Sequence, residues 1–139
     1  MALTTASKTI EIEILRRMLD SPTEAIAWLR EMGLVEVMRA HADLVRIAER
    51  GVTLDLLAKI CNQLAVELPK VSDADMALSN LERFFEAVRS PLSLAALFER
   101  DPEALPTLLQ IFSSSQYLSD QLVRDNESYD LLRINEGQP

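Results

Sequence analysis

Residues that begin or end α-helices divide this sequence into short segments, and this punctuation limits the possible fold more than any other feature. The sequence SPTE at positions 21–24 has the form of a capping box with proline at the first helical position. Gly33 and Gly51 fit the left-handed residue that commonly follows a helix. Pro69 ends the next helical pattern, because proline cannot continue a helix through its interior. These signals predict short helices joined by tight turns.

Apolar residues recur within these segments at the spacing of amphipathic helices. Thr53 is expected to cap one such helix, and Ser72 is expected to cap another that carries an acidic first turn. Later turns are marked by Ser90-Pro91, Asp101-Pro102 and Asn126. Ser113-Ser114-Ser115 is expected to be a turn between two apolar helices, and Ser115 can cap the second of them. The apolar stripe that follows Thr53 comprises Leu54, Leu57, Ala58, Cys61, Leu64, Ala65 and Leu68.

Positions 9–15, TIEIEIL, alternate apolar and polar residues as a half-buried strand does. The alternation runs directly into LRRML, and no partner strand is evident elsewhere in the sequence. A lone strand cannot satisfy its backbone hydrogen bonds, so we expect a helix here as well.

We therefore predict an all-α fold, an irregular bundle of about seven or eight short amphipathic helices without a sheet. The 139 residues, 48% of them hydrophobic, suffice for one domain with a buried core. A single helical domain is expected over residues 1–134, with leading helices in 7–68 and a second group in 72–133. Residues 135–139 are expected to begin a linker.

The charge and the apolar pattern exclude several classes of partner. The formal net charge is −8, and the longest basic run is Arg16-Arg17, so we expect no nucleic-acid partner. No uninterrupted apolar segment is long enough to cross a bilayer, and the N-terminus lacks the pattern of a secretory signal. We therefore expect a cytoplasmic protein without a membrane partner.

Few residues suggest catalysis or metal binding. Cys61 is the only cysteine and has apolar neighbours, so an inert core residue is expected. His41 is the only histidine, and Met38 stands where a di-iron helix would carry glutamate, so a helix-surface or half-buried residue is expected. Asp73 and Asp75 have the spacing of a magnesium-binding pair, but their place at a helix start favours interaction with free backbone N–H groups instead. No catalytic, cofactor-binding or metal-binding residue is therefore predicted.

One polar helical face is open to two interpretations. Asn80, Glu82 and Arg83 lie on the same predicted helix, and Glu82 and Glu86 are at the right spacing to pair with Arg83 or Arg89. This face is either a solvated surface with salt bridges or a docking surface for a following domain.

Two stretches, ADMALSNLERFFEAVRSP at 74–91 and LPTLLQIFSSSQYLSDQLVRDNESYDLLR at 105–133, resemble the glutamate–ammonia ligase adenylyltransferase family. The matching motifs lie at 80–84, 115–120 and 124–127, in the order and spacing of that family. Asn126 departs from the pattern, because the family usually has proline there. The resemblance spans about Ser72 to Arg133.

The resemblance implies a noncatalytic helical segment that precedes the first nucleotidyltransferase domain of a larger enzyme. Such enzymes attach AMP to a tyrosine of glutamine synthetase and also remove it, in the service of nitrogen regulation. The implied partners are the downstream nucleotidyltransferase domain, glutamine synthetase and a nitrogen regulatory protein. ATP and magnesium are implied only for the catalytic domains, which would follow the linker around 135–139.

The resemblance also indicates where an inter-domain contact would lie. The candidate residues are Asn80, Arg83, Arg100, Gln116 and Arg124, which the resemblance includes or adjoins. The alternative is a free-standing helical adaptor that shares only helix patterns with the family and exposes an apolar patch to its own partner. A small enzyme in its own right has the least support from the sequence.

Overall fold

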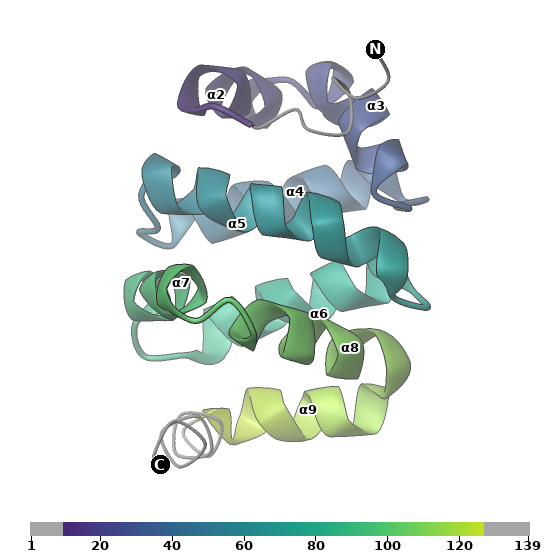
Figure 1. The fold of residues 1–139 in the computed structure, drawn as a ribbon, viewed down its shortest axis with the longest axis vertical. Helices are drawn as coiled ribbons and strands as arrows, with labels where there is room; N and C mark the ends of the chain where they lie inside the picture. The colour runs from purple at the N-terminus through teal and green to yellow at the C-terminus, as the bar shows by residue number, and fades with distance from the viewer. Residues whose placement is uncertain (1–9, 127–139) are drawn as a thin grey trace.

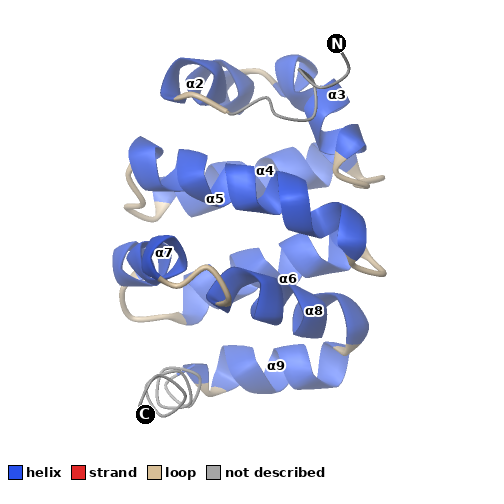
Figure 2. Ribbon diagram, in the orientation of Figure 1, coloured by secondary structure: helices blue, strands red, loops and turns tan. Residues whose placement is uncertain are grey.

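The chain folds as a stack of short α-helices. The structure is a computed structural model, and it describes residues 10–126. Every regular element in this range is helical, as Figure 2 shows, and the all-α prediction is confirmed. The elements are α2 (Ile12–Asp20), α3 (Pro22–Glu31), α4 (Val37–Glu49), α5 (Leu54–Glu67), the 3₁₀ helix η1 (Leu68–Lys70), α6 (Ala74–Ala87), α7 (Pro91–Arg100), α8 (Ala104–Ser114) and α9 (Gln116–Arg124).

The helices form layers that follow the order of the chain (Figure 1). Helices α2 and α3 form one end, α4 and α5 the next layer, and α6 to α8 the layer after that, with α9 at the opposite end. Helix α6 has the most neighbours, since it packs against α4, α7, α8 and α9. The predicted irregular bundle is thus an ordered stack, and α6 connects its middle to its far end.

Local capping explains several of the helix ends. Gly33 and Gly51 have φ angles of 93° and 95°, a left-handed conformation that glycine adopts without a steric penalty. Thr53, Ser90 and Ser115 each accept a hydrogen bond from the backbone N–H three residues later. The predicted ends at these positions are confirmed.

Two predicted caps differ in detail. Helix α3 begins at Pro22 as predicted, but the Ser21 side chain makes no capping hydrogen bond. Ser72 is not the N-cap of α6, because Asp73 takes that place and accepts from the Met76 N–H at 3.0 Å. The Ser72 hydroxyl instead donates to the carbonyl of Ser113 at 3.3 Å. The prediction placed this cap one residue too early.

The strand-like segment at 9–15 is helical from Ile12 onward, which confirms the helix prediction for that part. Ile10 precedes this helix and is buried, and its N–H donates to the side-chain oxygen of Asn62 at 2.8 Å. Leu15 and Met18 form the buried face of α2. Burial of this face against α3 and α5 explains why an alternating sequence forms a helix.

Aromatic side chains pack at the centre of the core. Phe84 and Phe112 have ring centroids 5.7 Å apart, and Phe85 and Phe98 meet edge to face at 5.9 Å. All four rings are fully buried. These pairs connect α6 to α8 and to α7, and they fix the layer that carries the candidate contact residues.

Two residues considered for catalysis are part of the core. Cys61 is fully buried, as predicted. His41 was expected at a helix surface or half-buried, and that prediction is wrong, since only 9% of it is exposed. Its Nε2 donates to the Met18 carbonyl at 2.7 Å, which links α4 to the end of α2. A buried imidazole needs such a partner because an unpaired polar group would be costly there.

Several predictions concern residues outside the described range. The predicted helical residues 7–9 and 127–133, the domain limit at 134 and the linker at 135–139 lie beyond it. Within residues 10–126, no helix combines the length and hydrophobicity that a membrane crossing requires.

Candidate interaction surface of α6 and α9

Three of the five candidate contact residues meet in one hydrogen-bonded cluster. Asn80 and Arg83 come from α6, and Gln116 comes from the first turn of α9. Asp120, one turn further along α9, completes the set. We call Asn80, Arg83, Gln116 and Asp120 the α6–α9 cluster.

Asn80 is the buried member of the α6–α9 cluster, with 2% of its surface exposed. Its amide nitrogen donates to the carbonyl of Phe112 at 3.0 Å, near the end of α8. Its oxygen accepts from Arg83 at 2.9 Å and from Gln116 at 3.3 Å. The Phe112 carbonyl is free to accept because the last carbonyls of a helix lack partners within it. Asn80 therefore connects α6 to both α8 and α9.

Arg83 and Asp120 form the solvent-facing part of the α6–α9 cluster. One guanidinium nitrogen of Arg83 lies 2.9 Å from the Asp120 carboxylate, and both side chains are about two-fifths exposed. Gln116 also donates to this carboxylate, at 2.8 Å. The hydrogen bonds from Gln116 and Arg83 hold the pKa of Asp120 below its usual value, because they favour its charged form.

The start of α9 is fixed by its serines. Ser115 accepts from the Leu118 N–H at 3.0 Å and so caps α9. Ser119 is fully buried, and its hydroxyl donates to the carbonyl of Ser115 at 2.7 Å. The serines at 113–115 were predicted as a helix–helix turn, and the boundary between α8 and α9 at Ser115 confirms it. This turn places Gln116 and Asp120 opposite α6.

Asp120 was not among the predicted contact residues. The sequence did indicate that Asp120 lies beside Gln116, because residues four positions apart on a helix share a face. The partner across the interface, Arg83, is 37 positions away in the sequence. Only the packing of α6 against α9 brings the two together.

The pairing predicted for Glu82 on α6 is wrong. Glu82 does not pair with Arg83 or Arg89, but with Arg50 at the end of α4, at 2.5 Å. Glu82 and Asn80 are both buried, so this part of α6 is not a solvated salt-bridge face. Helix α6 packs against several neighbours, and its buried polar side chains Asn80 and Glu82 are bonded inside the molecule.

Arg100 and Arg124 lie outside the α6–α9 cluster. Arg100 is exposed at the end of α7. Arg124 is exposed at the end of α9, where it lines a polar depression of about 360 Å³ with Arg89 and Asn126. The Asn126 amide donates to the Ala87 carbonyl at 3.4 Å and so connects the end of α9 to α6. The structure thus brings three of the five predicted residues together and leaves two at separate surface positions.

Helix α9 also exposes two large apolar side chains beside the α6–α9 cluster. Tyr117 is 70% exposed and Leu118 is 50% exposed. They follow Gln116 directly and extend the surface beyond the polar cluster. Tyrosine is among the residues enriched where proteins bind one another.

The acidic pair considered for magnesium serves two different backbone sites. Asp73 caps α6, whereas the Asp75 carboxylate accepts from the N–H groups of Val35 and Glu36 at 2.9 and 3.0 Å. Asp75 thereby connects α6 to the loop before α4. Among residues 10–126, no three His, Cys, Asp or Glu side chains are grouped so as to hold a metal ion.

Cys61 has the chemistry of a core residue. Burial raises the pKa of its thiol to about 12, because the apolar surroundings disfavour the thiolate. The thiolate is the nucleophilic form of cysteine. This position therefore supports the predicted inert role.

Comparison with known proteins identifies no relative of this chain. No protein-family model, no curated protein and no solved structure matches the chain. The resemblance to the adenylyltransferase family stays a prediction that depends on the motifs in the sequence.

Proposed function

We propose that this chain is a noncatalytic helical segment that docks onto a following nucleotidyltransferase domain. The parent protein would resemble a glutamine synthetase adenylyltransferase. The observation that carries this proposal is the α6–α9 cluster. Its residues come from the two motifs that carry the resemblance, which lie more than 30 positions apart in the sequence, and they meet at one edge of the helix stack.

The role we propose is positional. The α6–α9 cluster fixes α9 at the end of the stack (Figure 1). Tyr117 and Leu118 are exposed on this helix. A following domain would bury these side chains and leave the solvent-facing ion pair of Arg83 and Asp120 at the rim of the contact. ATP and magnesium would act in that following domain, and glutamine synthetase and a nitrogen regulatory protein would be partners of the assembled enzyme.

The exposed apolar pair also favours a second candidate, a free-standing adaptor. In that case the same surface of α9 would bind a separate protein. The two proposals share the surface and differ in the partner, so a binding experiment with the downstream gene product separates them.

The test measures binding between the purified chain and the downstream remainder of its gene product by isothermal titration calorimetry. We expect binding by the wild type and at least tenfold weaker binding by the double variant Tyr117→Ala, Leu118→Ala, because exposed anchors add affinity without supporting the fold. Val66→Ala is the matched control, since Val66 is 56% exposed on another helix. No binding at high micromolar concentration would contradict the docking proposal.

A second assay addresses the noncatalytic role. The chain is incubated with labelled ATP, magnesium and glutamine synthetase. We expect the synthetase to remain unlabelled. Robust labelling by this chain alone would overturn the proposal.

A further inference from the structure

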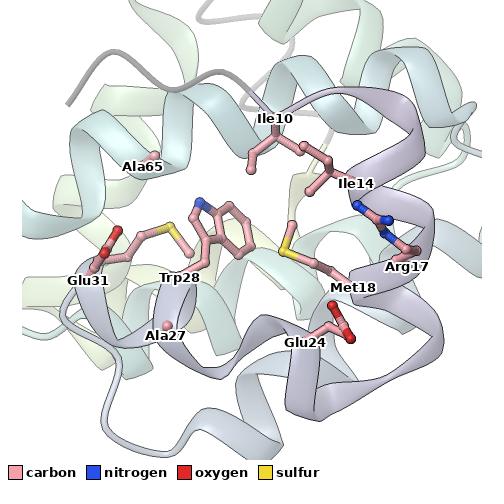
Figure 3. A pocket seen from close by; sticks show the side chains of 10 residues that line it. Ile10, Ile14, Arg17, Met18, Glu24, Ala27, Trp28, Glu31 and Ala65 are labelled. Atoms are coloured by element: carbon pink, nitrogen blue, oxygen red, sulfur yellow. The ribbon is translucent and has the colours of Figure 1, made fainter. Parts of the chain in front are cut away.

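A groove lies at the end of the helix stack formed by α2 and α3, opposite α9 (Figure 1). Its volume is about 390 Å³, and it lies between α2, α3 and one side of α5. Figure 3 shows the lining side chains. This groove is separate from the α6–α9 cluster and is not used by the function proposed above.

The floor of the groove is apolar. Met18 and Met32 are buried beneath it, whereas Ile14 and Trp28 are partly exposed. The Trp28 ring faces the Met18 side chain in Figure 3, and Met32 also lines the groove. Methionine and tryptophan adapt well to a docked apolar surface, because thioethers are flexible and the indole offers a large contact area.

The rim of the groove is charged in a regular pattern. Glu24, Trp28 and Glu31 follow one another at intervals of four and three residues along α3, so they share one face of this helix. Both glutamates are exposed. Arg17 lines the other side of the groove from α2 and is also exposed. The α3 side of the groove is therefore acidic, and the α2 side carries one positive charge.

We propose that this groove binds an amphipathic helix of a partner protein whose apolar stripe is flanked on one side by basic residues. The basic residues would face Glu24 and Glu31, and the apolar stripe would cover Trp28. A polar or acidic residue on the other side of the stripe would face Arg17. The charge complementarity fixes both the chemistry of the partner and its orientation.

The dimensions favour a helix as the occupant. Glu24 and Glu31 are seven positions apart, which corresponds to about 10 Å along the axis of α3. Two basic residues seven positions apart on a partner helix span the same length. Residues seven positions apart lie on one face of a helix, so the two basic residues would stand beside apolar anchors spaced at three, four and seven residues, as in helices that dock into grooves.

The experiment uses the full chain and the emission of Trp28, the only tryptophan in the sequence. The probe is a synthetic leucine–lysine helix of about 18 residues, roughly five turns, with lysines seven positions apart beside a leucine stripe. We expect saturable binding and a blue shift of Trp28 emission, because the docked leucines exclude water from the indole. The same peptide with glutamates in place of the lysines should bind at least tenfold more weakly.

A pair of double variants separates local recognition from net charge. Glu24→Gln with Glu31→Gln removes two charges at the groove, and we expect affinity for the lysine peptide to fall about five- to tenfold. Glu86→Gln with Glu103→Gln removes two charges from exposed positions on other elements and should leave the affinity unchanged. Equal weakening by both pairs would overturn the proposal, because the peptide would then respond only to net charge.

Other occupants give different outcomes. Peptide binding without a change in Trp28 emission would place the contact elsewhere and overturn the proposal. Saturable binding of an apolar dye without any response to the lysine peptide would assign the groove to a small molecule. Concentration-dependent dimerisation that shifts Trp28 emission would assign it to a second copy. Peptide binding that occurs only after deletion of residues 1–9 would assign the groove to that segment. The dye, dimerisation and deletion results would each overturn the proposal.

Discussion

Arg50, at the end of α4, donates a hydrogen bond to the carboxylate of Glu82 on α6, at 2.5 Å. The Glu82 side chain is 9% exposed and the Arg50 side chain 26% exposed, so this ion pair lies largely inside the molecule. The two residues are 32 positions apart in the sequence. The pair holds together two neighbouring layers of the stack, and its surroundings lead to the first two predictions.

Replacement of Glu82 by alanine should destabilise the fold. The change leaves the partly buried Arg50 guanidinium without its carboxylate, and removal of one partner from a buried pair costs about 2–4 kcal/mol. Chemical denaturation followed by circular dichroism measures the change in the free energy of unfolding. Glu99→Ala is the control, because its pair with Lys59 is nearly half exposed and should contribute nothing measurable. An equal loss in the two variants would contradict a special role for the buried pair.

Replacement of Asp43 by asparagine should stabilise the fold above pH 6. Burial, with a further contribution from the charge of Glu82, raises the pKa of Asp43 from 3.8 to about 6. The folded state therefore binds this proton more tightly than the unfolded state does. Its contribution to stability is complete below pH 4 and is lost as the pH rises towards 6, so the ionised carboxylate is unfavourable at neutral pH.

The expected gain for Asp43→Asn at pH 7 is about 1–2 kcal/mol, and it should disappear near pH 4. The loss of the ion pair with Arg46 reduces the gain only slightly, because the Arg46 side chain is 53% exposed. Thermal unfolding of both proteins across this pH range provides the measurement. Asp55→Asn, which removes the same charge from an exposed position, controls for net charge. A destabilised Asp43→Asn variant at pH 7 would refute the argument.

Within the α6–α9 cluster, Asn80 should contribute more to the free energy of unfolding than Arg83 does. Asn80→Ala removes the partner of the Phe112 carbonyl in a buried position and should lower the free energy of unfolding by about 1–3 kcal/mol. Arg83→Ala removes a partly exposed ion pair and should change stability little. Denaturation curves for the two variants test this order. A larger loss for Arg83→Ala would mean that the ion pair, and not Asn80, fixes α9.

The two glycines that end helices should respond alike to alanine. A Cβ at Gly33 would lie 3.8 Å from the Cβ of Ala74, an ordinary contact, and one at Gly51 would meet nothing within 4 Å. The cost of each change is therefore the left-handed backbone alone, about 1–2 kcal/mol. Equilibrium unfolding of Gly33→Ala and Gly51→Ala measures it. Asparagine at either position should cost less, and a much larger loss at Gly33 alone would indicate a steric clash instead.

The sequence by itself determined the helical class and most of the boundaries between helices. Gly33, Thr53, Ser90 and Ser115 act on backbone groups within a few residues, so the local sequence contains all that these helix ends require. Even the error at Ser72 is a shift of one residue, because two adjacent capping residues compete for the same N–H groups. Asn80, Arg83 and Gln116 were named as candidate contact residues from motif resemblance alone, and their meeting in one cluster was not predicted.

Only the tertiary structure decided which polar side chains meet. Asp75 reaches the loop before α4, Glu82 reaches Arg50, and His41 reaches the Met18 carbonyl, across 23 to 40 positions of sequence. Such pairs depend on which helices pack together and at what rotation. The short-range spacing of a helix does not contain this information, because one helical face can be buried, paired or solvated according to its neighbours.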